Sequence, residues 1–227
     1  MRVVSLVPSL TETLIAWGVE PVACTRFCEQ PALLHVGGTK DPDVAAIVAL
    51  APELVVMDRE ENRREDAEAL IAAGLDVVST DVTSVAGVAE MTATLRARLS
   101  LEPLAEEDAW PDLQVWTTAF IPIWRRPWMT CSGHTYGSSL LAAIGVANVY
   151  EQSDSTYPTV ELEDVAARSP QLVLLPSEPY PFKQRHVAEI AAAIPSASIR
   201  FVDGQDLFWW GARTRAARDR LAAVLAP

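Results

Sequence analysis

Two ten-residue stretches of the chain match each other without a gap. APELVVMDRE covers residues 51–60 and SPQLVLLPSE covers residues 169–178, and each is followed by an alanine-rich helical stretch. A second pair occurs in the same chain order: SLTETLIAWGV at 9–19 and YGSSLLAAIGV at 136–146 share a leucine, a glycine and a valine at matching positions. Two ordered matches predict two similar lobes.

Within the first half, β-branched apolar runs alternate with helical patterns. Ser9 and Glu12 have the spacing of a helix capping box, and Gly18 and Gly74 stand where helices should end. The expected strands are 3–7, 54–57 and 75–80, and the expected helices are 9–18 and 62–73. Strands that alternate with helices predict a parallel sheet covered on both faces.

The longest uninterrupted helix pattern covers residues 84–99 and is followed by an acidic, turn-rich stretch. We therefore predict an N-terminal α/β lobe at 1–83, a backbone helix and linker at 84–111, and a C-terminal α/β lobe at 112–227. Ligands of open α/β sheets bind outside the carboxyl ends of the strands, so a cleft between the lobes is the expected binding site. Ser9, Glu60 and Glu178 each follow a predicted strand and should lie near its rim.

Charge and hydropathy exclude several classes of protein. The net charge of -12 and the pI of about 4.7 argue against nucleic acid or anionic lipid as a partner. No run approaches the ~20 apolar residues that a transmembrane helix needs. The N-terminus, MRVVSLVPS, is too short and strand-like for a signal peptide, which predicts a cytoplasmic protein or a mature domain trimmed of its leader.

The residues that usually carry chemistry are scattered. No two histidines have the spacing of metal ligands on one helix, so neither a protein-built metal site nor an intrinsic cofactor is predicted. Cys131 lies three residues before His134, which leaves open a cytoplasmic α/β enzyme that uses this pair. Cys24 and Cys28 are expected to be buried thiols, with a local disulfide in an oxidising compartment as the alternative.

Aromatic residues in loops are more informative. Trp124 and Trp128 flank an Arg-Arg-Pro turn, and Trp209 and Trp210 follow a phenylalanine. Such rings either fold back as lids on the core or form the walls of a site for a flat ligand. Arginines stand beside both tryptophan pairs in the sequence. They either bind anionic or amide groups of that ligand or are ordinary solvated side chains, and they are Arg125, Arg126 and Arg213.

The segment LPSEPYPFK, residues 175–183, ends an apolar run with a glutamate between prolines. Proline fixes the backbone and stops a strand from continuing. A stiff loop is therefore expected to present Glu178 to a partner and Tyr180 and Phe182 to a ligand.

Several segments together resemble one family of proteins. They are RVVSLVPSLTE at 2–12, TRFC at 25–28, VGGTKDPD at 36–43, ENR at 61–63, IWRRPWMT at 123–130 and SEPYPFK at 177–183. The chain resembles the cobalamin- and ferric-siderophore-binding proteins of ABC importers. The resemblance implies class III architecture, in which two Rossmann-like lobes with parallel sheets are joined by a single long backbone helix. One departure is the stretch 99–113, which is shorter than the family's usual helical extension.

The resemblance also implies a function. The chain would be a non-enzymatic protein, expected to be a monomer, that captures a corrinoid such as cobalamin between its lobes for an ABC importer permease. A ferric siderophore or another metal-containing chelate, or a cytoplasmic role in corrinoid handling, is the alternative. The family implies a periplasmic or cell-surface location.

Residue roles carry over by position. Glu178 in the second lobe, and Glu60 or Glu61 in the first, correspond to acids that dock onto basic pockets of the permease. The residues implied to contact the ligand are Ser9, Phe27, Trp124, Trp128, Tyr180, Phe182, Trp209 and Trp210.

Overall fold

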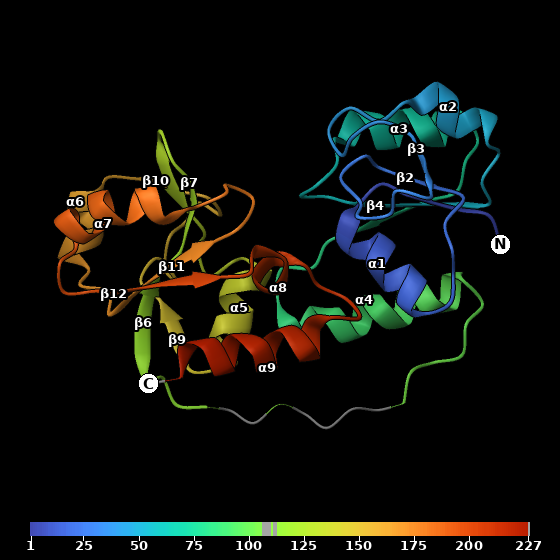
Figure 1. The fold of residues 1–227 in the computed structure, drawn as a ribbon. Helices are drawn as coiled ribbons and strands as arrows, with labels where there is room; N and C mark the ends of the chain where they lie inside the picture. The colour runs from blue at the N-terminus through green and yellow to red at the C-terminus, as the bar shows by residue number, and fades with distance from the viewer. Residues whose placement is uncertain (106–109, 111–112, 227) are drawn as a thin grey trace. The chain divides into compact units, whose positions relative to one another are not determined.

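The computed structural model describes residues 1–105, 110 and 113–226, and the chain divides into two compact units (Figure 1). Unit 1 comprises Met1–Asp81, Val88–Ala105 and Trp210–Ala212, and unit 2 comprises Val82–Gly87, Glu106–Trp209 and Arg213–Pro227. The units differ from the predicted contiguous ranges, because the start of the long helix groups with unit 2 and Trp210–Ala212 groups with unit 1. The end of the predicted linker, at 106–109 and 111, lies outside the described residues.

Unit 1 is built on a five-stranded parallel sheet with strand order β3-β2-β1-β4-β5. Figure 1 shows α2 and α3 on one side of these strands and α1 and α4 on the other. The elements are β1 (Val3–Ser5), α1 (Pro8–Ala16), β2 (Ala23–Cys24), β3 (Leu34–His35), α2 (Val44–Ala49), β4 (Leu54–Asp58), α3 (Arg64–Ala72), β5 (Val77–Thr80) and α4 (Val85–Arg98).

The two central strands of this sheet are buried along their whole length. Every residue of β1 and β4 is buried, as expected for parallel strands covered on both faces. Val4, Val55 and Met57 pack with Ile47 of α2 and Leu70 of α3 in one apolar core. The predicted alternation of strands and helices is confirmed in this unit.

The predicted capping box at the start of α1 is wrong. The helix begins one residue earlier, at Pro8, and Val7 precedes it without a side-chain cap. Proline suits the first helical position because its fixed φ is already helical and its missing N–H would have no partner there. Ser9 therefore lies inside the helix, where it is buried.

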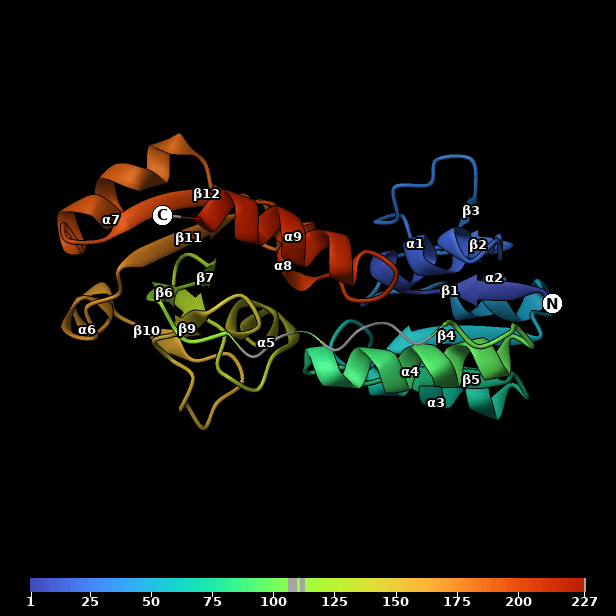
Figure 2. The ribbon, with the colours of Figure 1, turned by 90° about the horizontal axis from the view of Figure 1, so that it is seen from below.

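Unit 2 combines a four-stranded parallel sheet, order β12-β11-β6-β9, with a three-stranded antiparallel sheet, order β10-β8-β7. Figures 1 and 2 show α7 on the opposite side of β11 and β12 from α9. The elements are β6 (Thr117–Phe120), β7 (Pro122–Trp124), β8 (Trp128–Thr130), α5 (Tyr136–Ala142), β9 (Val146–Asn148), β10 (Thr159–Val160), α6 (Leu162–Ala167), β11 (Leu172–Pro176), the 3-10 turn η1 (Gln184–His186), α7 (Val187–Ala193), β12 (Ser198–Val202), α8 (Gly204–Phe208) and α9 (Thr214–Leu225).

The sequence repeat has a structural counterpart. Strands β4 and β11 begin and end at matching positions of the two aligned ten-residue stretches. Helices α1 and α5 are each followed by a glycine, Gly18 and Gly145, and both glycines have a φ of 78°. This left-handed conformation ends a helix and is readily adopted by glycine. The prediction of two similar α/β lobes with parallel sheets is confirmed.

Gly204 allows the start of α8 to approach the loop that carries Glu178. A Cβ atom at this position would lie 2.6 Å from the backbone nitrogen and oxygen of Glu178. We predict that Gly204→Ala lowers the free energy of unfolding of the protein by about 1–3 kcal/mol, because a contact with backbone cannot be relieved by a rotamer change. Urea denaturation measures this change.

Gly87→Ala is the matched control for this substitution. Its Cβ atom would meet nothing closer than Ser84 Oγ at 3.5 Å, and it lies in α4, where alanine is favoured over glycine by about 1 kcal/mol. If Gly204→Ala were as stable as Gly87→Ala, the close approach of α8 to the Glu178 loop would be wrong.

Candidate functional site: an aromatic cluster and two acidic loops

The hairpin of β7 and β8 lies against the loop that follows β11. The Trp124 and Tyr180 ring centroids are 5.4 Å apart in an edge-on arrangement, and the Trp128 and Phe182 rings stack at 5.9 Å with planes 3° apart. Tyr180 and Phe182 both also contact the ring of His186. These five residues, here called the aromatic cluster, come from two segments that the sequence analysis treated separately.

The aromatic cluster has a buried side and an exposed side. Trp128, Phe182 and His186 are buried, and the first two belong to the apolar core of unit 2. Trp124 is 45% exposed and Tyr180 is half-buried. Trp128 and Phe182 therefore pack in the core, whereas Trp124 and Tyr180 expose part of their ring surface to solvent.

An ion pair lies beside the aromatic cluster. The guanidinium of Arg125 binds the carboxylate of Glu189 at 2.6 Å and lies 5.8 Å from the ring of Trp128. Burial lowers the pKa of His186, and the positive charges of Arg185 and Arg125 lower it further, while Glu189 opposes this effect. His186 is therefore held neutral at neutral pH, and the cluster is an apolar surface without net charge at its centre.

The second tryptophan loop is organised by a buried carboxylate. Asp206 accepts hydrogen bonds from Arg220 at 2.6 and 2.7 Å and from Arg213 at 3.3 Å. The guanidinium of Arg213 also lies over the ring of Trp209, 5.0 Å from its centroid. Trp209 is half-buried in unit 2, whereas Trp210 is buried in unit 1. Of this pair, only Trp209 offers a ring face.

In unit 1, Phe27 is the open aromatic residue. Its side chain is 54% exposed, and the guanidinium of Arg26, itself paired with Asp41, lies 4.8 Å from its ring centroid. Ser9, the other predicted contact in this unit, is 7% exposed within α1. Phe27 is thus the more accessible of the two.

Glu60 and Glu61 are exposed on a turn that a buried carboxylate holds in place. Asp58, at the end of β4, accepts hydrogen bonds from the backbone N–H of Glu60 at 2.9 Å and from Thr80 Oγ1 at 2.5 Å. Asn62 closes the turn by accepting the Asp58 N–H at 2.8 Å and donating to the carbonyl oxygens of Leu6 and Thr39. Burial raises the pKa of Asp58, while the hydrogen bonds from Thr80 and from the backbone lower it in part.

Glu178 occupies the corresponding turn of unit 2, after β11. Ser177 anchors this turn to α8 and β12. Its Oγ accepts the N–H of Gly204 in α8 at 2.9 Å, and its own N–H donates to the carbonyl oxygen of Val202 in β12 at 3.1 Å. Glu178 is half-buried and is followed by a cis proline. Both predicted docking turns are therefore held by hydrogen bonds to neighbouring segments of their own unit.

The residues that hold these loops were not predicted from the sequence. Asp58 and Asp206 are buried charges, and His186 is a buried ring between two aromatic neighbours. A signal existed for Asp58, because an aspartate directly after four apolar strand residues requires hydrogen-bond partners. Asp206 had no comparable signal, since its two arginines follow it at distances along the chain that only the packing of α8 on α9 explains.

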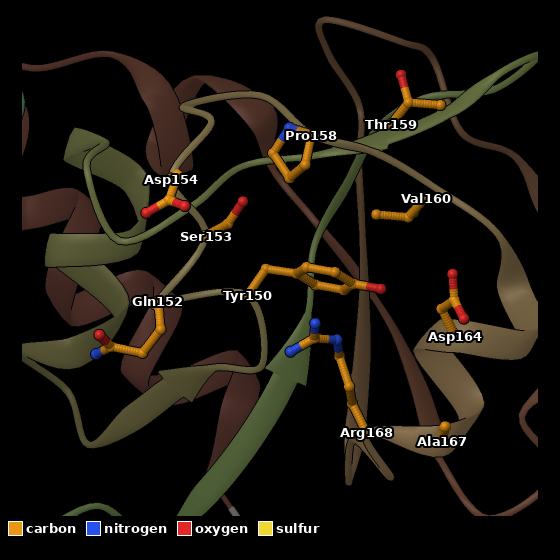
Figure 3. A pocket seen from close by; sticks show the side chains of 10 residues that line it. All are labelled: Tyr150, Gln152, Ser153, Asp154, Pro158, Thr159, Val160, Asp164, Ala167 and Arg168. Atoms are coloured by element: carbon orange, nitrogen blue, oxygen red, sulfur yellow. The ribbon is translucent and has the colours of Figure 1, made fainter.

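A separate pocket of about 800 Å³ opens between α6 and the segment that joins β9 to β10 (Figure 3). Arg168 lies 4.2 Å from the ring centroid of Tyr150 there, and Asp154 and Asp164 stand at other points of the lining. None of the predicted ligand contacts lines this pocket. Its lining is mostly polar and charged, which does not suit a flat apolar ligand face.

Cys131 and His134, the pair that the alternative enzyme would use, differ in their exposure to solvent. Cys131 is buried and His134 is exposed. The described residues contain no group of three or more histidine, cysteine or acidic side chains that could hold a metal ion. Across the same part of the chain, no helix has both the length and the apolar composition to cross a membrane.

Comparison with known proteins identifies relatives of the chain. A family model described as Periplasmic binding protein matches residues 3–109. The Vitamin B12-binding protein of Photorhabdus laumondii is 28% identical over 193 residues, covering 77% of this chain and 70% of that protein. The protein of the same name from Yersinia pestis is 29% identical over 194 residues, covering 77% and 69%.

Solved structures share the fold at lower identity. The periplasmic vitamin B12 binding protein BtuF of Vibrio cholerae has a TM-score of 0.76 at 19% identity, with 99% of this chain and 96% of that chain covered. The periplasmic heme-binding protein BhuT, solved with two hemes, has a TM-score of 0.79 at 17% identity, with 99% and 97% covered.

The fold is that of the class III substrate-binding proteins. The resemblance to cobalamin- and ferric-siderophore-type substrate-binding proteins, drawn from the sequence, is confirmed by the matching family and by these relatives.

The raised pKa of Asp58 predicts a specific dependence of stability on pH. In the range between the ordinary aspartate pKa and the raised value, the folded protein binds a proton that the unfolded chain releases. The unfolding free energy of the wild type, relative to that of Asp58→Asn, should therefore fall as the pH rises through this range. Urea denaturation of both proteins between about pH 4 and pH 7 measures the difference.

Asp154→Asn is the control, since Asp154 is exposed. Its stability relative to the wild type should change little over the same range. A flat difference between the wild type and Asp58→Asn would show that burial does not shift the proton affinity of Asp58.

Proposed function

We propose that the chain captures a corrinoid, cobalamin-like ligand as the substrate-binding component of an ABC importer and catalyses no reaction. The observation that carries the proposal is the aromatic cluster, in which Trp124 and Tyr180 offer ring surface on a base of buried rings. The vitamin B12-binding relatives support the same ligand class.

The buried rings explain how such a surface would bind with little loss of entropy. Trp128 and Phe182 are stacked in the core, and Tyr180 lies 4.7 Å from Phe182, so the outer rings rest on an ordered support. Binding to side chains that are already ordered costs less conformational entropy than binding to mobile ones. Phe27 and Trp209 are the further ring surfaces available to the ligand.

The ion pairs beside the exposed rings favour a ligand whose peripheral groups are largely uncharged. Arg125 is paired with Glu189 and Arg213 with Asp206, so these cations are already engaged by carboxylates. A corrinoid carries mostly amide side chains, which exchange hydrogen bonds with such pairs without demanding an unpaired cation. An anionic ferric siderophore is the second candidate and would require these pairs to open. The prediction that the ligand lies between the two lobes stays a prediction.

The burial of Cys131, the candidate nucleophile, also fits a binding role better than a catalytic one. A catalytic thiol needs an accessible, electropositive environment, whereas Cys131 is 1% exposed and its carbonyl is bound by Asn148. The cytoplasmic enzyme that the sequence left open would need Cys131 to reach a substrate. The structure therefore favours a ligand-binding protein over that alternative.

Trp124→Ala tests the role of the aromatic cluster. We predict that it weakens cobalamin binding, measured by calorimetry, by about 1–3 kcal/mol, the range found for aromatic contacts at interfaces. Trp116→Ala is the matched control, because Trp116 is 43% exposed in the same unit but lies outside the cluster. Equal affinities of the two variants, with a lower melting temperature for Trp124→Ala, would make Trp124 a core lid and contradict the proposal.

The two acidic turns are proposed to dock onto basic pockets of the permease. Glu60 and Glu61 are exposed in unit 1, and Glu178 stands at the corresponding place in unit 2. Each turn is held by hydrogen bonds within its own unit, as a rigid docking element requires.

Glu178→Ala should leave cobalamin affinity unchanged and weaken association with the cognate permease in detergent by roughly tenfold or more, because one partner of a charge pair is removed. Glu60→Ala and Glu61→Ala identify which acid serves in unit 1. Glu163→Ala, on the exposed side of α6, is the control. Loss of cobalamin affinity in Glu178→Ala with unchanged permease association would instead make Glu178 a ligand contact.

A further inference from the structure

Two of the three cysteines lie at the end of β2 in unit 1. Cys24 is the last residue of the strand and Cys28 lies in the turn that follows, with Thr25, Arg26 and Phe27 between them. Both are buried, at 0% and 6% exposure, and both are free thiols. Cys131 belongs to unit 2.

The two side chains share one face of the sheet. Cys24 pairs in register with Ser5 of β1, so their side chains point to the same side. Ser5 Oγ accepts a hydrogen bond from Thr11 Oγ1 at 2.8 Å, and Thr11 Oγ1 lies 3.2 Å from Cys28 Sγ. The chain of contacts from Ser5 through Thr11 therefore brings Cys28 to the side of the sheet on which Cys24 lies.

A tight turn returns Cys28 to the strand end. The Cys28 N–H donates to Thr25 O at 3.1 Å, and Thr25 Oγ1 lies 3.3 Å from Cys28 Sγ. The pKa of Cys24 is raised to about 12, first by burial and then by the charge and the hydrogen bond of Cys28. This influence of Cys28 on Cys24 agrees with the placement of both side chains on one side of the strand end, which the register with Ser5 and the contacts through Thr11 indicate.

We propose that Cys24 and Cys28 are a reversible dithiol–disulfide pair, oxidised by a small-molecule disulfide such as oxidised glutathione. The turn at residues 25–28 and the contacts through Thr11 place both thiols on the same side of the strand end, and all of these residues belong to unit 1. The inference does not depend on the ligand or on the permease.

The reaction balances as a thiol–disulfide exchange. Cys28, the more exposed of the two, attacks one sulfur of the small disulfide as its thiolate, which forms a mixed disulfide and releases one small thiol. Cys24 then loses its proton to solvent and attacks the Cys28 sulfur, which forms the intramolecular bond and releases a second small thiol. The protein loses two electrons and two protons, and the small disulfide gains them.

The bond would change the loop that presents Phe27. Closing a ring from residue 24 to residue 28 restricts Arg26 and Phe27. It also removes the thiol hydrogen of Cys28, whose Sγ lies within hydrogen-bond distance of Thr11 Oγ1 and Thr25 Oγ1. Oxidation would therefore act on the open aromatic residue of unit 1 without touching the aromatic cluster of unit 2.

Peptide mapping tests the proposal directly, because trypsin cleaves after Arg26, between the two cysteines. Purified full-length protein is incubated with oxidised glutathione, alkylated and digested without reductant. We expect the intact protein to lose the mass of two hydrogen atoms, and peptides 3–26 and 27–40 to appear joined until dithiothreitol separates them. Separate peptides with alkylated Cys24 and Cys28 would overturn the proposal, as would a link from either of them to Cys131.

Two variants sharpen the result. Cys131→Ser should still give the joined peptides, while Cys24→Ser should stop at a glutathione adduct on Cys28, because its resolving thiol is gone. A glutathione adduct on Cys28 of the wild type that persists, with no joined peptide, would also contradict the pairing. The wild-type map decides the question even if a variant folds poorly.

Discussion

The stack of Trp128 on Phe182 is the interaction on which the proposed binding surface depends. It fastens the β7–β8 hairpin to the loop after β11, two segments about fifty residues apart in the chain, and buries both rings in the core of unit 2. Trp124 and Tyr180 rest on this base. Without it, the hairpin and the loop would each present single aromatic side chains, with no common ring surface for a flat ligand.

A second constraint operates at the ends of the central strands. In unit 1, Asp58 and Asn62 use their side chains to satisfy the backbone of the turn that carries Glu60 and Glu61. In unit 2, Ser177 and the close approach of Gly204 serve the Glu178 turn. The corresponding turns of the two units are thus stabilised in different ways. Buried polar side chains hold the turn in unit 1, and the close approach of two backbone segments holds the turn in unit 2.

Local patterns were sufficient to predict two α/β lobes with parallel sheets, whereas the class III architecture was implied by the family resemblance. The repeat of proline, apolar strand and glutamate located β4 and β11, and Gly18 and Gly145 marked two helix ends, because strand burial and left-handed glycine depend on neighbouring residues. The start of α1 was predicted wrongly because Pro8 and Ser9 are competing start signals. Only proline removes the N–H that would need a cap.

Tertiary packing explains why the site was harder to predict. The sequence marked Trp124 and Trp128 as equivalent, yet Trp128 is buried in the apolar core of unit 2 whereas Trp124 lies outside that core and is 45% exposed. Trp209 and Trp210 separate in the same way, since adjacent residues fall in different units. The partners of Asp206 depend on how α8 packs on α9, which no local pattern encodes.

Calorimetric titration of the unmodified protein with cobalamin, heme and a ferric siderophore, side by side, tests the central claim most directly. We predict that cobalamin binds most tightly, with a Kd below about 1 μM, equivalent to roughly 8 kcal/mol of binding free energy. This prediction would be contradicted if cobalamin showed no heat of binding at ~100 μM, equivalent to about 5.5 kcal/mol, or if heme or the siderophore bound more tightly.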